Sequence, residues 1–567
     1  MNNLKNEKKA GYESIRLFLR NQVTGPQRII NLICIPVVIY LAWFLCGIFT
    51  HTLQDAGYPN EYREAANILL TKEFLGGGNP YSLSALSGEH PPMVYLYGPL
   101  YSVVVALIGK VVPMDLVLLH YIVTFGMILV SAFLGAWITA ERTTSITAPA
   151  AVFLFLITCH WRYNYVNAVP DSMALMLMIM VFFVLTRKRF RKKAIVCAVL
   201  TLAALLTKQY FLLVAGTITA WLFLFEKKAE SFKYLFYLAL LGALSVFVIQ
   251  WKFPLFWTYL IYFAKGPGSG VAGTVTRGTV KMSGEAYNFQ QIMSIGGMYL
   301  MLFIAETVGV IVSFFRKKLD RVDLLMLGHM AVAGICLLYI GKNDGAWLSY
   351  YLELFVPALV IGAFIMVEKV MLPSDRMLPK PWGFDIGFIR KITSAVKAQK
   401  WFIAGYTSFY LVLIGFTMFR TGTRLPVSPM EAEDYEQWSE AEALLDANPG
   451  DMYLYPPLAY YGIRNGIYLY NTGQPFVITE KFYNKYLENE EAQKNYPYAG
   501  EIFKSHLDYR DEIKEKVRNG EYSVVTYITD YDKVFDETDL KEKYRQEKIL
   551  TLQTGRWNWD VQFWVLK

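Results

Sequence analysis

Charged residues are scarce in this sequence. Asp, Glu, Lys and Arg together make up 18% of the 567 residues, whereas a soluble domain usually carries about 25%. Apolar residues account for 54% and aromatic residues for 16%. This balance excludes a disordered chain and a collagen, and it favours a polytopic α-helical membrane protein.

Cysteine is also rare, with five residues in the whole chain. All five fall inside apolar runs, and none is spaced as in a metal-binding or redox motif. A disulfide scaffold is therefore excluded. We expect the five to be inert packing residues: Cys34, Cys46, Cys159, Cys197 and Cys336.

The net charge of +8 is unevenly distributed along the chain. Residues 421–567 hold 17 basic and 26 acidic groups, whereas residues 1–420 hold 38 basic and 21 acidic groups. The basic surplus thus belongs to the hydrophobic part of the chain. There it follows the positive-inside rule of membrane proteins and does not indicate a nucleic-acid partner.

The basic clusters also predict the topology. A spanning helix needs roughly 20 apolar residues. If every apolar segment crossed the membrane, the basic cluster at 187–193 would lie outside. Treating 94–112, which contains Pro99, as an interfacial or re-entrant segment places all strong basic clusters inside. We therefore expect about eleven transmembrane helices, with the N-terminus inside and the tail outside. The apolar segments are 29–50, 94–112, 115–139, 145–160, 171–186, 194–207, 210–226, 233–251, 292–315, 323–341, 347–367 and 401–420.

Three parts follow from this topology. Residues 1–28 form a basic cytoplasmic N-terminus, and no A-x-A-like cleavage site follows it, so the first span is expected to be an anchor. Residues 29–420 form the transmembrane domain, with a large first outer loop at 51–114. Residues 421–567 are expected to form a small extracytoplasmic α/β domain, because helix-like and β-like stretches alternate there. The helix-like stretches are 431–447 and 541–547, and the β-like runs are 452–454, 522–528 and 561–566.

The first outer loop carries an acidic and aromatic segment. Asn60 is a suitable N-cap for a short helix that runs to about Phe74. Glu61 and Glu64 lie three residues apart and would share one side of this helix, which we expect to lie on the membrane surface. Acids in the first turn of a helix are also stabilised by the helix dipole, so they need no function.

Two corners between spans carry charges close to the membrane. Arg162 and Asp171 flank the outer turn between 145–160 and 171–186, where they either serve a site or pair with each other to close the hairpin. Lys208, with Gln209 and Tyr210, separates the short segments 194–207 and 210–226. Short, interrupted apolar segments usually line a cavity. Lys208 is flanked by apolar residues, so it either binds an anion or reaches outward to lipid headgroups.

The order of these features resembles the GT-C membrane glycosyltransferases over roughly residues 29–420. The first span and the acidic-aromatic helix are followed by a Gly-x-Pro-Tyr turn at 78–81, a Pro-Pro-x-x-Tyr element at 91–95 and a Pro-Asp corner at 170–171. The resemblance is to bacterial members that use polyprenyl-phosphate sugars, which are related to protein mannosyltransferases and lipid A aminoarabinose transferases.

The resemblance implies that an acid of the first outer loop is the catalytic base. Tyr58 stands where the family pattern places an Asp, which leaves Asp55 and Glu61 as rival bases and Glu64 as a third candidate. The Thr-Lys element at 207–208 implies a lipid phosphate as the partner of Lys208. The segment 341–353 partly matches a Gly-Asn-x-Asn-Tyr-x-x-Glu-like family sequence. The substrate-binding candidates are then Arg63, Glu64, His90, Arg162, Asp171, Lys208, Gln209, Tyr210, Asn343, Asp344, Tyr350 and Glu353. His90, which precedes two prolines, also fits a loop-packing role.

The expected activity is transfer of a sugar from a polyprenyl-phosphate donor to a cell-envelope glycan, lipid or protein on the extracytoplasmic face of the cell membrane. A carboxylate would accept the proton of the attacking hydroxyl. No acidic or histidine cluster has the spacing of metal ligands, so no resident cofactor is expected, while a divalent cation bound through the donor phosphate is compatible with the sequence. Two alternatives remain open: a transporter or flippase of lipid-linked sugars, and a polysaccharide polymerase or ligase.

Overall fold

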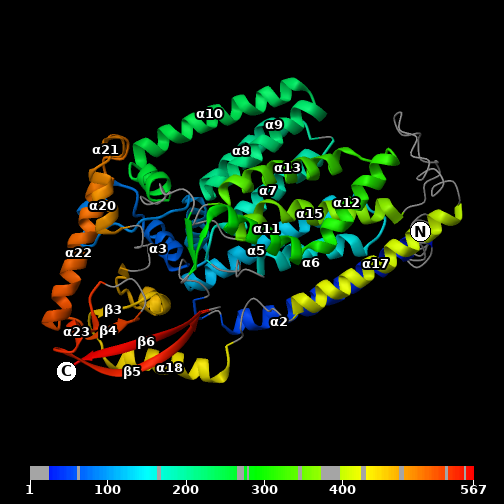
Figure 1. The fold of residues 1–567 in the computed structure, drawn as a ribbon. Coiled ribbons are helices and arrows are strands. Elements are labelled where there is room, and N and C mark those ends of the chain that lie inside the picture. Colours follow the sequence, from blue (N-terminus) through cyan, green and yellow to red (C-terminus); the bar gives the residue numbers. More distant parts are fainter. Residues whose placement is uncertain are drawn as a thin grey trace, which may run out of the picture.

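The computed structural model shows a helical bundle with a smaller α/β domain at one end (Figure 1). It describes residues 25–567 except for short gaps, and the description below covers those residues alone. The gaps are 56, 60–63, 162–167, 189, 265–273, 278–279, 343–347, 372–395, 423–429, 471–477, 530–533 and 555–556.

Long apolar helices form the frame of the bundle. Within the described residues, four helices are long and apolar enough to cross a membrane: α2 (Gly25–Gln54), α5 (Leu116–Ala140), α10 (Lys228–Lys252) and α13 (Arg321–Ile340). Two bent pairs raise this number to six. They are α11 (Gly284–Met298) with α12 (Leu300–Phe315), bent by 80°, and α14 (Leu348–Leu354) with α15 (Val356–Met371), bent by 47°. The chain is thus a helical membrane protein, as the composition predicted.

Shorter apolar helices fill the space between the long ones. They are α4 (Leu100–Val111), α6 (Thr147–Trp161), α7 (Asp171–Thr186), α8 (Lys193–Thr207) and α9 (Leu213–Phe225). A further long helix, α17 (Val396–Gly422), packs beside α2. Helices therefore occupy every apolar segment that the sequence indicated, and the number that cross the membrane stays a prediction.

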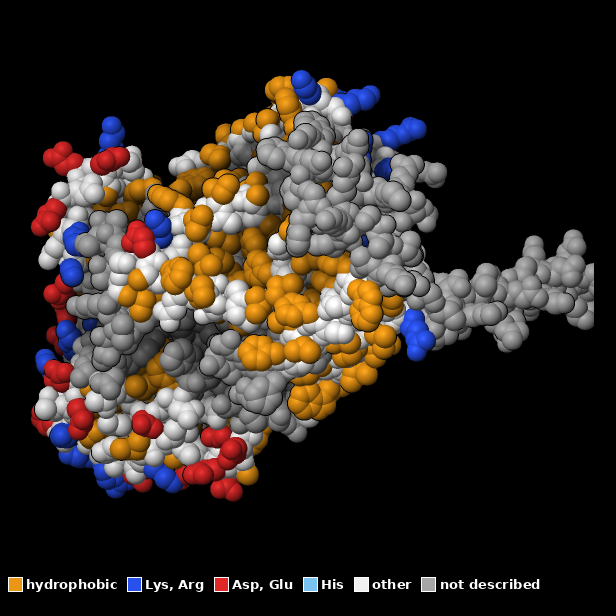
Figure 2. Space-filling view, turned by 45° about the vertical axis from the view of Figure 1, so that its right-hand side comes forward, with side chains coloured by type: hydrophobic (Ala, Val, Ile, Leu, Met, Phe, Trp, Pro, Cys, Tyr) orange, Lys and Arg blue, Asp and Glu red, His pale blue; other side chains and the backbone are white. Residues whose placement is uncertain are grey.

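The distribution of apolar side chains separates the core from the outer surface of the bundle. The side chains of α7 and α15 are almost all buried. On α10, by contrast, large residues such as Phe236, Phe247 and Trp251 are exposed. Hydrophobic side chains cover the middle of the molecule, and acidic and basic side chains gather at the end that holds the C-terminal domain (Figure 2). This is the pattern expected of a bundle that presents its outer helices to lipid.

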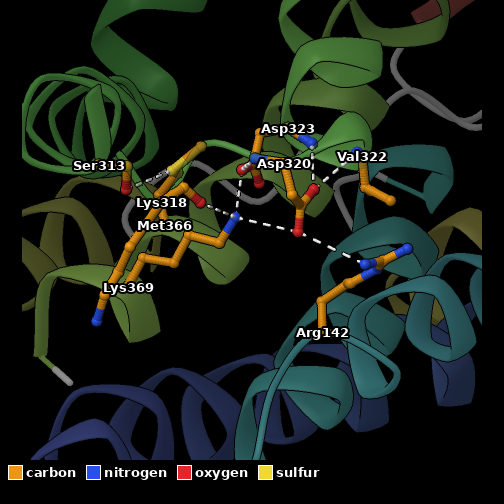
Figure 3. A network of polar contacts seen from close by, with 8 residues as sticks. All are labelled: Arg142, Ser313, Lys318, Asp320, Val322, Asp323, Met366 and Lys369. Carbon is orange, nitrogen blue, oxygen red and sulfur yellow. Dashed lines mark hydrogen bonds and ion pairs between the residues drawn. The ribbon is translucent and has the colours of Figure 1, made fainter. Parts of the chain in front are cut away.

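An ion-pair network joins the ends of three helices of the bundle (Figure 3). Asp320 caps the N-terminus of α13 by accepting from the backbone N–H groups of Val322 and Asp323. Lys369 at the end of α15 pairs with both Asp320, at 3.3 Å, and Asp323. Arg142, just beyond α5, pairs with Asp320 at 3.5 Å. These contacts fix the relative positions of α5, α13 and α15.

The topology can be checked by cysteine-accessibility labelling on a background without the five native cysteines. We expect single cysteines in 187–193 to be labelled only from the cytoplasm, because this cluster obeys the positive-inside rule. Cysteines near residues 60, 270 and 500 should be labelled from outside in intact cells. Labelling of the tail only after lysis would overturn the orientation and the extracytoplasmic placement of the site.

The C-terminal domain is built on a four-stranded sheet in the order β3-β4-β6-β5. β3 (Met452–Tyr453) runs parallel to β4 (Val524–Tyr527), whereas β4 and β5 (Tyr544–Thr554) are both antiparallel to β6 (Trp557–Leu566). The main helices of the domain are α18 (Ala432–Ala447), α19 (Ala459–Asn465) and α22 (Ala499–Asn519). A small α/β domain was predicted at this end of the chain, and the structure confirms a small domain of helices and strands there.

One prediction for this domain was wrong. The stretch 541–547 was expected to be helical because it is rich in charge, but helix α23 (Glu537–Leu540) ends before it and β5 begins at Tyr544. β5 is the edge of the sheet, and its first half exposes Arg545, Gln546 and Glu547. Charged residues on an edge strand protect the edge from pairing with other chains, and this composition mimics that of a solvated helix.

The C-terminal domain packs directly on the first outer loop. The hydroxyl of Tyr468 donates to the carbonyl of Pro91 at 3.1 Å, and His506 Nε2 lies 2.9 Å from the carbonyl oxygen of Pro92. Burial lowers the pKa of His506 to about 4, so this ring is neutral at ordinary pH and its Nε2–H donates to Pro92. The loop and the domain thus share a buried interface.

Candidate functional site

A buried charge cluster lies where α8 ends. Lys208 has an extended backbone that breaks the chain between α8 and the short 3-10 helix η2 (Gln209–Leu212). Its side chain is 2% exposed. The ammonium group lies 2.5 Å from Asp171 Oδ1 and 3.1 Å from Glu353 Oε1. The sequence predicted an interruption between two short apolar segments. In the structure, this interruption places the Lys208 ammonium between two carboxylates.

Aromatic rings complete the surroundings of Lys208. The hydroxyl of Tyr210 donates to Glu353 Oε2 at 2.5 Å. The Lys208 ammonium also lies 4.9 to 5.8 Å from the ring centroids of Tyr97, Tyr210 and Tyr350, a distance at which cation–π attraction operates. We refer to Asp171, Lys208, Tyr210 and Glu353 as the Lys208 cluster.

The side chain of Gln209, next to Lys208, is hydrogen-bonded to two other segments of the chain. Its side-chain amide donates to the carbonyl of Leu96 at 2.9 Å and to that of Leu260 at 3.5 Å. Leu96 belongs to the first outer loop, so the Lys208 cluster lies at the contact between this loop and the membrane helices. Asp171 starts α7 and Glu353 lies in α14. The cluster therefore gathers side chains from parts of the chain far apart in sequence.

Buried charged side chains such as those of the Lys208 cluster are uncommon in proteins, because burial is unfavourable for a charge. Burying a charge is unfavourable by several kcal/mol unless it is paired and hydrogen-bonded. Here one buried cation faces two buried carboxylates, so the formal charge of the cluster is negative. Charged groups kept at such depth are functional candidates by default.

The partners of Lys208 differ from those expected. Its sequence neighbours indicated an apolar surround that a bound phosphate would compensate, or an outward path to headgroups. The structure instead shows a buried lysine whose counter-ions are the chain's own Asp171 and Glu353. The sequence could not reveal this, because both acids lie more than 30 residues away from Lys208 along the chain.

Glu64 is another buried acidic residue, and it is the first residue of α3 (Glu64–Leu75). It is fully buried. Its Oε1 accepts from the hydroxyl of Tyr121 and from the backbone N–H of Ala168, both at 3.3 Å, and its Oε2 accepts from the hydroxyl of Tyr460 at 2.7 Å. This carboxylate joins α3, α5, the turn before α7 and the C-terminal domain.

Asp55, one of the two proposed bases, lies just after α2 and is 7% exposed. Its carboxylate accepts a hydrogen bond from the hydroxyl of Tyr435 in α18. The neighbouring Tyr58 packs its ring against Trp438 at 4.8 Å between centroids. The loop that carries Asp55 is thus covered by the C-terminal domain.

His90 packs among aromatic rings. It stacks on Tyr468 at 3.9 Å between centroids and meets Tyr509 edge-on at 5.5 Å. These contacts match the loop-packing role that the two following prolines suggested. Five predicted site residues lie outside the described part of the chain: Glu61, Arg63, Arg162, Asn343 and Asp344.

Several site residues were not singled out from the sequence. Tyr97 is one of them, and its position two residues after Tyr95 was the only signal in the sequence. No sequence signal marked three other tyrosines: Tyr121, Tyr435 and Tyr460. The chain has 39 tyrosines, and these three are distinguished only by their hydrogen bonds to Glu64 or Asp55. Within the described residues, no group of three or more His, Cys, Asp or Glu side chains could hold a metal ion.

Comparisons with solved structures find a likeness that extends over most of the chain. No protein-family model and no curated protein sequence matches the chain. The structure is similar to ArnT from Cupriavidus metallidurans, both bound to undecaprenyl phosphate and in the apo state. In each case the identity is 12%, the match covers 93% of this chain and 97% of the other, and the TM-score is 0.49. At this identity the likeness extends to no residue role.

Proposed function

We propose that this protein is a membrane glycosyltransferase that moves a sugar from a polyprenyl-phosphate donor to an acceptor on the extracytoplasmic face. The observation that carries the proposal is the Lys208 cluster, a buried arrangement of one cation, two carboxylates and aromatic rings where the first outer loop meets the membrane helices. A site that joins apolar helices to a polar loop suits a substrate with a lipid tail and a sugar head.

The reaction has simple requirements. A hydroxyl of the acceptor attacks the anomeric carbon of the donor, the bond from that carbon to the phosphate oxygen breaks, and the polyprenyl phosphate leaves with the bonding pair. A carboxylate of the first outer loop, Asp55 or Glu61, takes the proton from the hydroxyl. Partial burial suits this role, because it makes a carboxylate a stronger base than it is in water.

The leaving phosphate needs cations nearby. Lys208 already faces two carboxylates, so its use as a phosphate ligand requires one of them to move away or to take up a proton. Arg63 and Arg162, which the sequence places in the same outer region, are the other proposed cations. Asp171, Tyr210, Tyr350 and Glu353 are proposed to contact the sugar, since carboxylates and tyrosines bind sugar hydroxyls and ring faces.

The activity can be tested with purified protein in lipid nanodiscs and a panel of radiolabelled polyprenyl-phosphate sugars. Consumption of a single-sugar lipid phosphate, with transfer of the label, is the expected result. Consumption of a diphosphate-linked oligosaccharide would instead indicate a polymerase or ligase. Movement of lipid-linked sugar across the bilayer without cleavage would indicate a transporter. Either outcome would overturn the proposal.

A matched pair of variants ties the activity to the site. Glu353→Gln preserves the shape of the side chain but removes one of the two charges that face Lys208. We expect it to lower transfer at least 10-fold, because a hydrogen bond to a charged group contributes about 1.5–3 kcal/mol. Glu436→Gln changes an exposed acid on the C-terminal domain and should leave transfer unchanged. Equal activity of the two variants would place the site elsewhere.

A further inference from the structure

Glu64 lies where the transmembrane domain and the C-terminal domain meet. The hydroxyl of Tyr460, in α19, donates to Glu64 Oε2 at 2.7 Å, and both residues are buried. The other oxygen, Oε1, accepts from the backbone N–H of Ala168. Ala168 precedes Asp171 by three residues, and Asp171 is the first residue of α7. A chain of polar contacts therefore runs from the C-terminal domain to the Lys208 cluster.

We propose that Tyr460 is a positioning residue of the active site. Its hydroxyl holds Glu64, and Glu64 holds the segment 168–170 so that Asp171 meets Lys208. The C-terminal domain is then a working part of the transferase and not an appended module. This inference rests on the proposed function, because it assigns a role within that same site.

The chemistry of the contact fixes the direction of the hydrogen bond. Burial, together with the adjacent Glu64, raises the pKa of Tyr460 well above its usual value. The phenol therefore keeps its proton and donates it to the carboxylate, as does the hydroxyl of Tyr121 from α5 at 3.3 Å. The carboxylate of Glu64 thus accepts from both hydroxyls and from the Ala168 N–H.

The surroundings of α19 show that the helix is fastened on more than one side. The ammonium of Lys72, in α3, donates to the carbonyl of Ile463 at 3.3 Å. Arg464 lies 3.5 Å from Asp115, the N-cap of α5, and donates to the carbonyl of Gly57 at 3.4 Å. Tyr460 is thus held in register with both α3 and α5, which a positioning residue requires.

A mere packing contact does not need this arrangement. Two domains can be joined by apolar side chains, and replacing a buried ionic group by well-packed apolar residues is often neutral or stabilising. A buried carboxylate that accepts from donors on three different segments instead fixes a particular geometry. The geometry fixed here is that of the turn which delivers Asp171 to Lys208.

The test compares two adjacent tyrosines. Tyr460→Phe removes the hydroxyl that binds Glu64, whereas Tyr461→Phe removes a hydroxyl that binds Asp446 within the C-terminal domain. We expect Tyr460→Phe to lower turnover about 10- to 100-fold, the range of a hydrogen bond to a charged group, and Tyr461→Phe to leave it unchanged. Tyr121→Phe, which removes the other hydroxyl from Glu64, should lower turnover in the same direction.

A double-mutant cycle separates positioning from general destabilisation. If Tyr460 acts through Asp171, the variant Tyr460→Phe with Asp171→Asn should turn over no more slowly than Asp171→Asn alone, because both changes disturb the same contact. Independent, multiplicative losses would overturn the inference, as would equal turnover of Tyr460→Phe and Tyr461→Phe. In both cases wild-type transfer would still stand. A wild-type protein that transfers no sugar from any polyprenyl-phosphate donor would instead overturn the proposed function and this inference with it.

Discussion

Lys208→Met is expected to destabilise the protein by about 3–5 kcal/mol, the usual result of removing one partner from a buried ion pair. The change leaves Asp171 and Glu353, which are 4% and 2% exposed, without their shared cation. Two like charges then face each other away from water. Equilibrium unfolding of the purified protein in detergent measures the loss.

Two further variants make this expectation specific. Lys233→Met removes an exposed lysine that pairs with Glu230 on the surface of α10, and it should leave the stability nearly unchanged. Adding Asp171→Asn and Glu353→Gln to Lys208→Met removes the uncompensated charges, so the triple variant should recover a large part of the loss. If Lys208→Met were as stable as Lys233→Met, Lys208 would not be paired as the structure shows.

Removing the catalytic base should lower turnover by about 10²- to 10⁴-fold, the usual contribution of general base catalysis. Asp55→Asn and Glu61→Gln each remove a candidate while nearly preserving the size of the side chain. We favour Asp55, because the 57–59 turn can hold it above the end of the following helix. The structure adds that Tyr435 donates to this carboxylate. Transfer measured at saturating donor compares the two variants.

The control for both changes is Glu436→Gln, an exposed acid of α18, which should have wild-type turnover. Donor binding and melting temperature should stay close to wild type in Asp55→Asn and Glu61→Gln, because neither change creates a buried charge. If both variants keep near-normal turnover, the base lies elsewhere and the first outer loop is not the catalytic loop.

Most of the helical architecture could be predicted from the sequence, because a bilayer demands long apolar segments and composition reveals them directly. The break at Lys208 was also foreseeable, since a charged residue interrupts two short apolar runs. The strand that begins within 541–547 was not foreseeable. Its exposed charges serve an edge strand, and a local composition cannot distinguish an edge strand from a solvated helix.

The members of the Lys208 cluster were predicted individually, but not as one cluster. Asp171, Lys208 and Glu353 each stood out as a charge near an apolar segment. Which of them pair depends on how α7, α8 and α14 pack, and no periodicity carries that information. Asp171 was expected to pair with Arg162 or to contact substrate, and it pairs with Lys208. The roles of Tyr435 and Tyr460 could not be predicted for the same reason, because their contacts depend on how the C-terminal domain packs.

The hydrogen bond from Tyr460 to Glu64 spans 396 residues, and this separation constrains how the protein is made. A chain emerging from the ribosome inserts its early helices long before residue 460 has been synthesised and exported. Until then Glu64 lacks the hydroxyl of Tyr460 as a donor. The contact between Tyr460 and Glu64 can therefore form only after the last segment of the chain has been made. A chain arrested before that point would hold its membrane helices and still lack Tyr460, the residue proposed to position the site.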